Sequence, residues 1–533
     1  MATTEVKQAA AGTGESLPAI EVYSTLTKKK TPLVTVKPGQ VGMYLCGPTV
    51  YKPSHIGHMV GPVIFDTVKR YLVYSGWKVT WVVNITDIDD KIIAESAARG
   101  TTMAKLATEM TADYLDNLAV LGVESIDEMP KATEHIGTII AFIDGLIGKG
   151  YAYASDGDVY FDVMKDADYG KLTNRSVEAM QGEGGSTAER KRSTADFALW
   201  KKAKPGEPSW ESPWGPGRPG WHIECSAMSR AILGEHFDIH GGGLDLIFPH
   251  HENEIAQSES LHDCPMATYW MHNGLMQAAG AAGKVGGRPR GSESAADDAA
   301  AEAATQAATK ISKSTGAEPF KNLLARHRPE AIRFLLLSTH YRSPIHFGEE
   351  PLGESARALE AFERLFTRYQ RIAGKSFYAL PCRDRRAGNA AVGAAGEEVK
   401  ALREKFLAAM DDDFNTAIGM ATLFDFVRTA NKFVDQQGLE KKASTEALAV
   451  LDAMMLVLRE LTGTLGIFLK EPQAKTGGAD EGLVAKLMEL VIEIRARARG
   501  AKDFATADLV RNKLTEAGVV LEDRADGTLW TRK

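Results

Sequence analysis

Two histidines, His55 and His58, stand at the start of a predicted helix in the sequence His-Ile-Gly-His. A short buried strand is predicted at 41–45, and apolar residues then recur at helical spacing over 55–74. A helix start carries unpaired N–H groups and the positive end of the helix dipole, which suits a phosphate. Gly57 lets a flat ligand approach the backbone between the histidines. The pattern predicts a nucleotide site, with two ordinary surface histidines as the alternative.

A second group of side chains has the chemistry of a metal site. Cys46 follows the predicted strand, and Cys225 lies in a loop rich in tryptophan. His250 and Glu254 are four residues apart in a predicted helix, so they share one face. Two thiolates, an imidazole and a carboxylate form a reasonable zinc set, although the spacing is not that of a zinc finger. The alternative is two buried thiols and an ordinary surface helix.

A loop with two lysines, Lys310 and Lys313, forms the sequence Lys-Ile-Ser-Lys-Ser. Mobile ammonium groups suit a transferring phosphoryl centre, because negative charge accumulates there in the transition state. A solvated loop is the alternative interpretation. The segment 278–309 just before it is rich in alanine, contains no aromatic residue, and is interpreted as a low-complexity insertion.

The elements that must position these residues follow an α/β pattern. A β-branched strand is predicted at 78–84, and a polar, acidic loop follows it at 85–91. In open parallel sheets, ligands lie at the carboxyl ends of the strands. Another strand is predicted at 237–243, running into a glycine turn. Four segments with helical periodicity then suggest a bundle, at 352–372, 397–411, 413–436 and 443–469.

The composition limits the class of protein. The chain has 533 residues and a net charge of −7, which argues against indiscriminate coating of nucleic acid. No apolar run approaches the ~20 residues that span a bilayer, and the N-terminus lacks the apolar core of a signal peptide. Four cysteines are too few for a disulfide scaffold in a chain of this length. We therefore expect a cytoplasmic protein with no membrane partner.

Together these motifs identify a family resemblance. His-Ile-Gly-His at 55–58 and the loop at 310–314 resemble the two signatures of class I aminoacyl-tRNA synthetases, often written HIGH and KMSKS. Longer segments resemble the cysteinyl-tRNA synthetase family: MYLCGPTVY at 43–51, NITDIDDKII at 84–93, GWHIECSAM at 220–228, the stretch 237–257, and DDDFNT at 411–416. The resemblance extends from about residue 20 to 533, and it is interrupted at 278–309 and near 373–396.

The resemblance implies a fold and an activity. The family activates cysteine with ATP, releases pyrophosphate, and esterifies the terminal adenosine of its cognate tRNA. The resemblance implies a Rossmann-type catalytic domain in a monomeric protein. It also implies one Zn²⁺ held by Cys46, Cys225, His250 and Glu254, and Mg²⁺ that accompanies ATP. The substrate thiol would join the zinc as a thiolate, which a serine hydroxyl does far less readily.

The resemblance also assigns roles to individual residues. His55 and His58 would stabilise the transition state at the ATP phosphates, and Lys310 and Lys313 would close over the β- and γ-phosphates. The remaining implied contacts are to cysteine, from Thr86, Trp221 and His240, and to ATP, from Gly57, Gly242, Gly243 and Asp245. Position 311 is Ile where the family usually has Met.

The expected domains follow the same comparison. They are a disordered leader at 1–18, a catalytic domain at 19–277 with a connective insertion at about 115–220, the low-complexity insertion at 278–309, the signature loop and stem-contact region at 310–350, a tRNA-binding bundle at 351–470, and an anticodon-binding domain at 481–533. In the last of these, the basic stretch 495–502 and Trp530 suit single-stranded anticodon bases, with a solvated helix face as the alternative.

Two other functions share some of these features. A cysteine ligase of the mycothiol pathway has the same zinc set and both signatures, but it lacks the long helical end at 397–533. A non-catalytic tRNA-binding paralogue has no need of His55, His58, Lys310 and Lys313. Both comparisons favour the synthetase.

Overall fold

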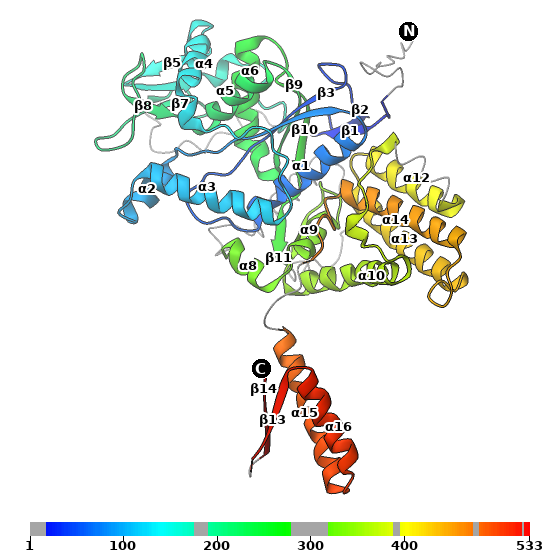
Figure 1. Cartoon of the computed structure of the whole chain (residues 1–533). Coiled ribbons are helices and arrows are strands. Elements are labelled where there is room, and N and C mark those ends of the chain that lie inside the picture. The colour runs from blue at the N-terminus through cyan, green and yellow to red at the C-terminus, as the bar shows by residue number, and fades with distance from the viewer. Residues whose placement is uncertain are drawn as a thin grey trace, which may run out of the picture. The chain divides into compact units, whose positions relative to one another are not determined.

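The computed structural model divides the chain into two compact units, Met1–Leu469 and Lys470–Lys533 (Figure 1). Most of the predicted insertion at 278–309 and of the predicted leader at 1–18 lies outside the described residues. The residues that the structure describes are 17–174, 190–278, 318–386, 395–472, 479–524 and 527–532.

Four parallel strands form the central sheet of the first unit. Their order is β10 (Ala267–Asn273), β9 (Phe237–Gly243), β3 (Gln40–Leu45) and β4 (Lys78–Val83). Met43 of β3 is paired with Trp81 on one side and Ile239 on the other, and all three side chains are buried. Strands that are covered on both faces are typical of parallel sheets, which explains their continuous apolar runs. The predicted α/β, Rossmann-type sheet is confirmed.

Helices cover this sheet and connect its strands. Between β3 and β4 the chain forms α1 (Gly57–Tyr74), which begins two residues later than the predicted helix. His55 therefore precedes the helix, and His58 lies in its first turn. The other helices of this region are α2 (Asp90–Ala98), α3 (Met103–Val120), α5 (Trp221–Leu233) and α6 (Glu252–His262). Asp89 caps α2 by accepting a hydrogen bond from the Lys91 backbone N–H.

A second, antiparallel sheet lies within the predicted connective region. Its strands follow chain order, β5 (Ala152–Ser155), β6 (Asp158–Phe161), β7 (Phe197–Lys202) and β8 (Gly217–Pro219). Helix α4 (Ile136–Gly148) packs against α5 and α6. Trp200 and Phe142 belong to the core that joins these elements.

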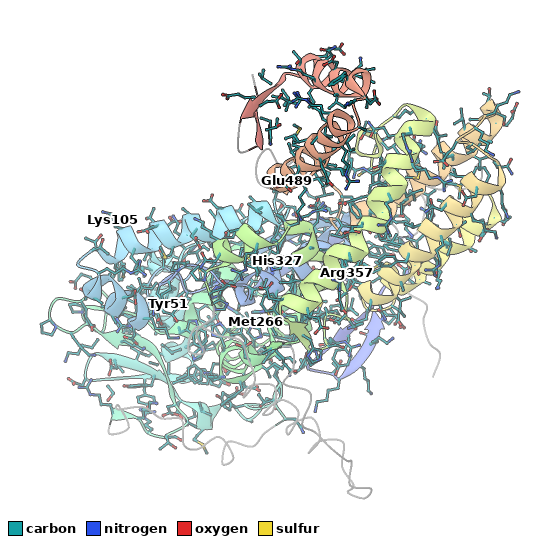
Figure 2. The ribbon with its side chains drawn as sticks, turned by 90° about the horizontal axis from the view of Figure 1, so that it is seen from below. Tyr51, Lys105, Met266, His327, Arg357 and Glu489 are labelled. Atoms are coloured by element: carbon teal, nitrogen blue, oxygen red, sulfur yellow. The ribbon has the colours of Figure 1, made fainter. Side chains whose placement is uncertain are left out.

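The remainder of the first unit is mainly helical (Figure 2). Its helices are α8 (Phe320–Arg326), α9 (Pro329–Leu337), α10 (Glu349–Ala373), α12 (Glu397–Asp411), α13 (Thr416–Gln436) and α14 (Thr445–Thr464). Short strands pair as β1 (Glu21–Ser24) with β2 (Lys29–Pro32), and β11 (Met276–Ala278) with β12 (Ile345–Phe347). The helix predicted at 413–436 begins three residues later, because Asp413 and Phe414 have positive φ angles and Asn415 caps α13.

The second unit has two helices and a hairpin, as the sequence predicts. It contains α15 (Ala479–Gly500), α16 (Phe504–Glu516), β13 (Val519–Arg524) and β14 (Gly527–Arg532). Asp523 of the hairpin forms ion pairs with Arg495 and Arg499 of α15. Among the described helices of both units, none combines the length and the apolar character needed to cross a bilayer.

Candidate active site and metal centre

A pocket of about 730 Å³ opens at the carboxyl ends of the parallel strands. Cys46 and Thr49 line it after β3, and Gly243 lines it at the end of β9. The start of α1 forms another wall, through His55 and His58. This edge is where open α/β sheets bind their ligands.

A larger groove of about 1020 Å³ lies between α10 and α13, away from every predicted site residue. Its charged groups largely neutralise one another, since Arg368 forms ion pairs with both Asp435 and Glu440. We therefore place the chemistry in the pocket at the strand ends.

The two signature histidines are held by the backbone in a defined orientation. Nδ1 of His58 accepts a hydrogen bond from the His55 backbone N–H at 3.1 Å, and Nδ1 of His55 accepts one from the Gly57 N–H at 3.1 Å. The two rings stack with their centroids 3.9 Å apart. Because Nδ1 is an acceptor in each ring, each neutral imidazole carries its proton on Nε2. Both side chains can therefore donate a hydrogen bond through Nε2.

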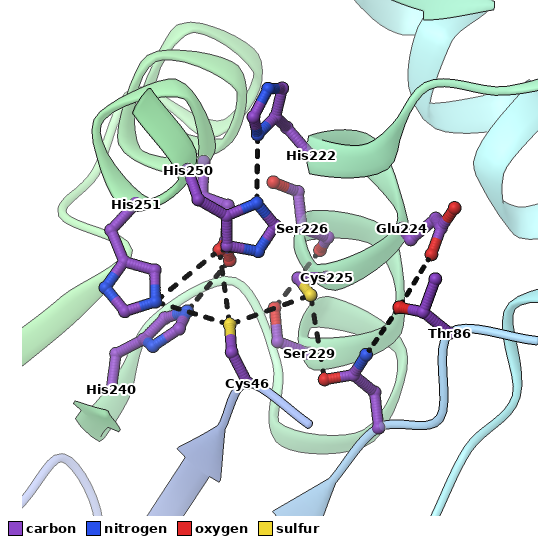
Figure 3. A network of polar contacts seen from close by, with 12 residues as sticks. Cys46, Thr86, His222, Glu224, Cys225, Ser226, Ser229, His240, His250 and His251 are labelled. Atoms are coloured by element: carbon purple, nitrogen blue, oxygen red, sulfur yellow. Dashed lines mark hydrogen bonds and ion pairs between the residues drawn. The ribbon is translucent and has the colours of Figure 1, made fainter. Parts of the chain in front are cut away.

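The structure brings together the four predicted metal ligands (Figure 3). One potential ligand atom from each of Cys46, Cys225, His250 and Glu254 lies within 4.8 Å of the other three. The two Sγ atoms are 3.7 Å apart, and Glu254 Oε1 lies 3.4 Å from Cys46 Sγ and 3.0 Å from His250 Nε2. Cys46 directly follows β3, and Cys225 lies on helix α5 and not in the predicted loop. His250 lies in a π-helical turn, Ile247–His251, and Glu254 lies in the first turn of α6, so separate elements supply the four groups.

Sequence reasoning missed a second, overlapping set of potential ligands. His240 and His251 combine with Cys46 and Glu254 within the same 4.8 Å limit. His251 Nε2 lies 3.3 Å from Cys46 Sγ, and His240 Nε2 lies 2.8 Å from Glu254 Oε2. The doubled histidine in Pro-His-His-Glu was the available signal. On a helix, residues three and four positions before Glu254 both share its face, and these are His251 and His250.

Further histidines support the cluster from outside. Nδ1 of His222 lies 2.9 Å from Nδ1 of His250, and His272 Nε2 lies 2.8 Å from His251 Nδ1. Such partners orient the rings of metal-binding histidines and fix their tautomers.

The electrostatics of the cluster suit a divalent cation. Burial raises the pKa of the Cys46 thiol well above its ordinary value, and burial lowers the pKa of His250 well below its own. Without a cation, both groups are therefore neutral. Zinc binds neutral imidazole and thiolate, so binding would release the thiol protons. The donor set of two sulfurs, one nitrogen and one carboxylate oxygen is one that zinc accepts.

The three predicted cysteine-pocket residues occupy different positions. Trp221 lines the pocket, is 38% exposed, and stacks on His250 with ring centroids 4.2 Å apart. His240 is fully buried and contacts the Glu254 carboxylate. Thr86 is also buried, and its hydroxyl contacts the Glu224 carboxylate at 3.2 Å. Burial raises the pKa of Glu224 well above its ordinary value, and its position beside Cys225 was the only sequence signal for it.

The predicted nucleotide contacts lie together in the pocket. Gly57, Gly242, Gly243 and Asp245 all line it. A Cβ atom at position 242 would lie 2.7 Å from the His251 ring, so the strand end has room only for glycine there. Lys310 and Lys313 lie outside the described residues.

Comparison with known proteins supports the same assignment. Residues 32–282 match the family model of the class I (C) tRNA synthetase catalytic domain, and residues 405–470 match that of the DALR domain. Cysteine–tRNA ligase from Pelotomaculum thermopropionicum is 42% identical, with 96% of this chain and 100% of the relative covered. Cysteine–tRNA ligase from Thioalkalivibrio sulfidiphilus is 44% identical with the same coverage.

Solved structures agree on the fold. Mycobacterium tuberculosis methionyl-tRNA synthetase in complex with methionyl-adenylate superimposes with a TM-score of 0.55 and 15% identity, covering 80% of this chain and 90% of that one. The catalytic-domain match, the DALR match and the full-length relatives lead to one conclusion. This chain belongs to the cysteine–tRNA ligase family of class I aminoacyl-tRNA synthetases.

Proposed function

We propose that the protein activates L-cysteine with ATP to cysteinyl-adenylate and pyrophosphate, and then transfers cysteine to the 3′-terminal adenosine of its cognate tRNA. One observation carries the proposal, which is that Cys46 belongs both to the sulfur-rich cluster and to the wall of the pocket that His55 and His58 line. On this proposal, the group that recognises sulfur and the histidines that bind phosphate would share one cavity. Relatives named cysteine–tRNA ligases, which this chain matches over their full length, support it.

The activation step needs charge stabilisation rather than a general base. The cysteine carboxylate is already ionised, and it attacks the α-phosphorus while the bond to pyrophosphate breaks. In our proposal, His55 and His58 donate from Nε2 to the phosphate oxygens, where negative charge grows in the transition state. Their backbone hydrogen bonds at Nδ1 hold the donors in place before ATP arrives.

Cysteine recognition is assigned to the cluster. Cys46, Cys225, His250 and Glu254 would hold Zn²⁺, which when bound supplies an acceptor that prefers a thiolate sulfur to a hydroxyl oxygen. A pocket that relied on shape alone would separate cysteine from serine poorly, because the two are nearly isosteric. Trp221 would close the pocket beside the substrate, since it already stacks on His250 at its wall.

The remaining assignments follow the family resemblance. Gly242, Gly243 and Asp245 would bind the adenosine, with Asp245 on the ribose hydroxyls, and Mg²⁺ would accompany ATP. Lys310 and Lys313 would close over the β- and γ-phosphates. The helical region at 351–470 and the domain at 481–533 would bind the tRNA. We further propose a monomeric, cytoplasmic enzyme.

The test uses the purified full-length protein. Pyrophosphate exchange and tRNA charging are measured with cysteine and with serine, and zinc content is determined on the same sample. We expect about one zinc per chain, exchange that depends on cysteine, and charging of cysteine tRNA. Exchange with serine at a comparable rate would contradict the assignment of sulfur recognition. Cysteine activation without any charging of tRNA would contradict the second half of the reaction.

A further inference from the structure

One lysine in the pocket at the strand ends has no role in the proposed reaction. Lys91 is the second residue of α2, at the end of the acidic loop that follows β4. Among the described residues that line the pocket, it is the only lysine or arginine. The chemistry of this pocket involves polyanions, so an unassigned ammonium group there needs a partner.

The neighbouring carboxylates do not supply that partner. Asp90 forms ion pairs with Lys201 and Arg218, and Glu95 forms one with Arg99 at 2.8 Å. No ion pair joins Lys91 to another residue in the part of the chain that the structure describes. Asp90 and Glu95 are thus paired with other cations, Asp89 accepts a hydrogen bond from the Lys91 backbone N–H, and the Lys91 ammonium group is exposed at the pocket wall.

An aromatic ring lies beside this lysine. Nζ of Lys91 is 5.9 Å from the centroid of the Tyr51 ring, which also lines the pocket and is labelled in Figure 2. Single-stranded nucleic acid is commonly bound by a cationic group on the backbone next to an aromatic ring on which a base can stack. The acceptor end of a tRNA is such a single strand.

The sheet order separates this corner from the nucleotide-binding glycines. Gly242 and Gly243 end β9, Lys91 follows β4, and β3 lies between those two strands. The ATP phosphates are expected at the start of α1. A phosphate bound at Lys91 is therefore assigned to the tRNA, which is the second polyanion in the reaction.

We propose that Lys91 binds a phosphate of the tRNA acceptor end, next to the terminal adenosine, and is a substrate-binding residue of the transfer step. This inference rests on the proposed function. The ammonium group would orient the terminal ribose so that its hydroxyl reaches the carbonyl carbon of the adenylate. The hydroxyl oxygen then bonds to the carbonyl carbon, and the bond from that carbon to the phosphate oxygen breaks. AMP leaves with the electrons of the broken bond, and its phosphate takes up the hydroxyl proton.

The chain offers a matched control for the experiment. Lys52 lies 5.9 Å from the same Tyr51 ring, but it forms an ion pair with Glu95 at 3.8 Å and does not line the pocket. Lys91→Ala and Lys52→Ala remove the same charge from neighbouring positions. Both lysines are exposed, and melting temperatures check that both variants fold.

The assay compares the two half-reactions in the full-length enzyme. For Lys91→Ala, we expect tRNA charging to fall about tenfold more than pyrophosphate exchange, and the slope of log KM for tRNA against log salt to decrease by about 0.7. Lys52→Ala should behave like the wild type in both. Equal losses of exchange and charging would overturn the inference in favour of an ATP contact, and charging at the wild-type level would overturn it outright. If the wild type itself fails to charge tRNA, the proposed function is what has failed.

Discussion

The hydrogen bonds at the signature histidines lead to a prediction that two substitutions at one position can test. Nδ1 of His58 accepts from the His55 backbone, so Nε2 is the atom that can donate to a phosphate. Asparagine places its terminal polar group near the position of Nδ1, whereas glutamine reaches the position of Nε2. His58→Asn therefore keeps the structural contact and loses the donor, and His58→Gln does the opposite.

The magnitudes follow from these two roles. Removal of one preorganised donor to a developing charge costs about 10²–10³ in kcat. We expect that loss for His58→Asn, with a melting temperature close to the wild type. His58→Gln retains a donor at reduced precision, so we expect a loss of about tenfold. Its lost backbone contact is a single hydrogen bond, worth about 1 kcal/mol.

The assay is cysteine-dependent pyrophosphate exchange at saturating ATP and cysteine, because this reaction involves no tRNA. KM for ATP is measured for both variants, since a contact made mainly in the transition state lowers kcat more than it raises KM. If His58→Asn exchanges faster than His58→Gln, the assignment of Nε2 as the catalytic donor is wrong. If both variants match the wild type, His58 has no role in stabilising the phosphate.

Three further predictions concern the metal site, the buried Asp413 carboxylate and the pH dependence of the C-terminal hairpin. Glu254→Gln should lower the zinc content measured by atomic absorption and reduce the preference for cysteine over serine in exchange. Asp413→Ala should destabilise the first unit by about 3–5 kcal/mol in calorimetry, because buried Asp413 accepts three hydrogen bonds, while exposed Asp412→Ala should cost below about 1 kcal/mol. Hydrogen bonds from Arg495 and Thr528 hold the pKa of Asp523 well below its usual range. Because the pKa is lowered in the folded state, the Asp523 carboxylate stabilises the hairpin fully above its ordinary pKa of about 4, and this stabilisation is lost as the pH falls below that value. Asp523→Asn should therefore remove this acid sensitivity of the hairpin in amide exchange.

The local pattern of the sequence was sufficient for most elements of the fold. Strand β4 and helix α1 were predicted to within two residues, because their apolar residues follow one period without interruption. Helix α13 begins three residues later than predicted, because the structure places two residues with positive φ angles before the helix. Such backbone conformations are set by tertiary contacts, here those of the Asp413 carboxylate, and hydrophobic periodicity does not report them.

The site was predictable where a residue type is chemically rare. Two cysteines and a histidine–glutamate pair stood out in sequence, and the structure brings them together. The buried supports could not be recognised in the same way. His222 and His272 contact the site only because α5 and β10 pack beside it, and a single histidine in a helix or strand carries no sign of such a contact.

Helix α1 also shows why the bundle is needed to position the pocket. Its first turn carries His58, and its last turns carry Tyr71 and Tyr74. Tyr71 donates a hydrogen bond to Asp411, which also forms an ion pair with Arg385.

The Tyr74 hydroxyl contacts Glu460, which is paired with Arg403 at 2.7 Å. Two groups of tyrosine, carboxylate and arginine, joined by a hydrogen bond from Arg403 to the Arg385 carbonyl, thus connect one end of α1 to the bundle. Groups of this kind add little net stability compared with apolar packing, but misplacement would leave a buried charge without its partner. The arrangement therefore favours one position of α1, and with it one position of His58 at the other end of the same helix.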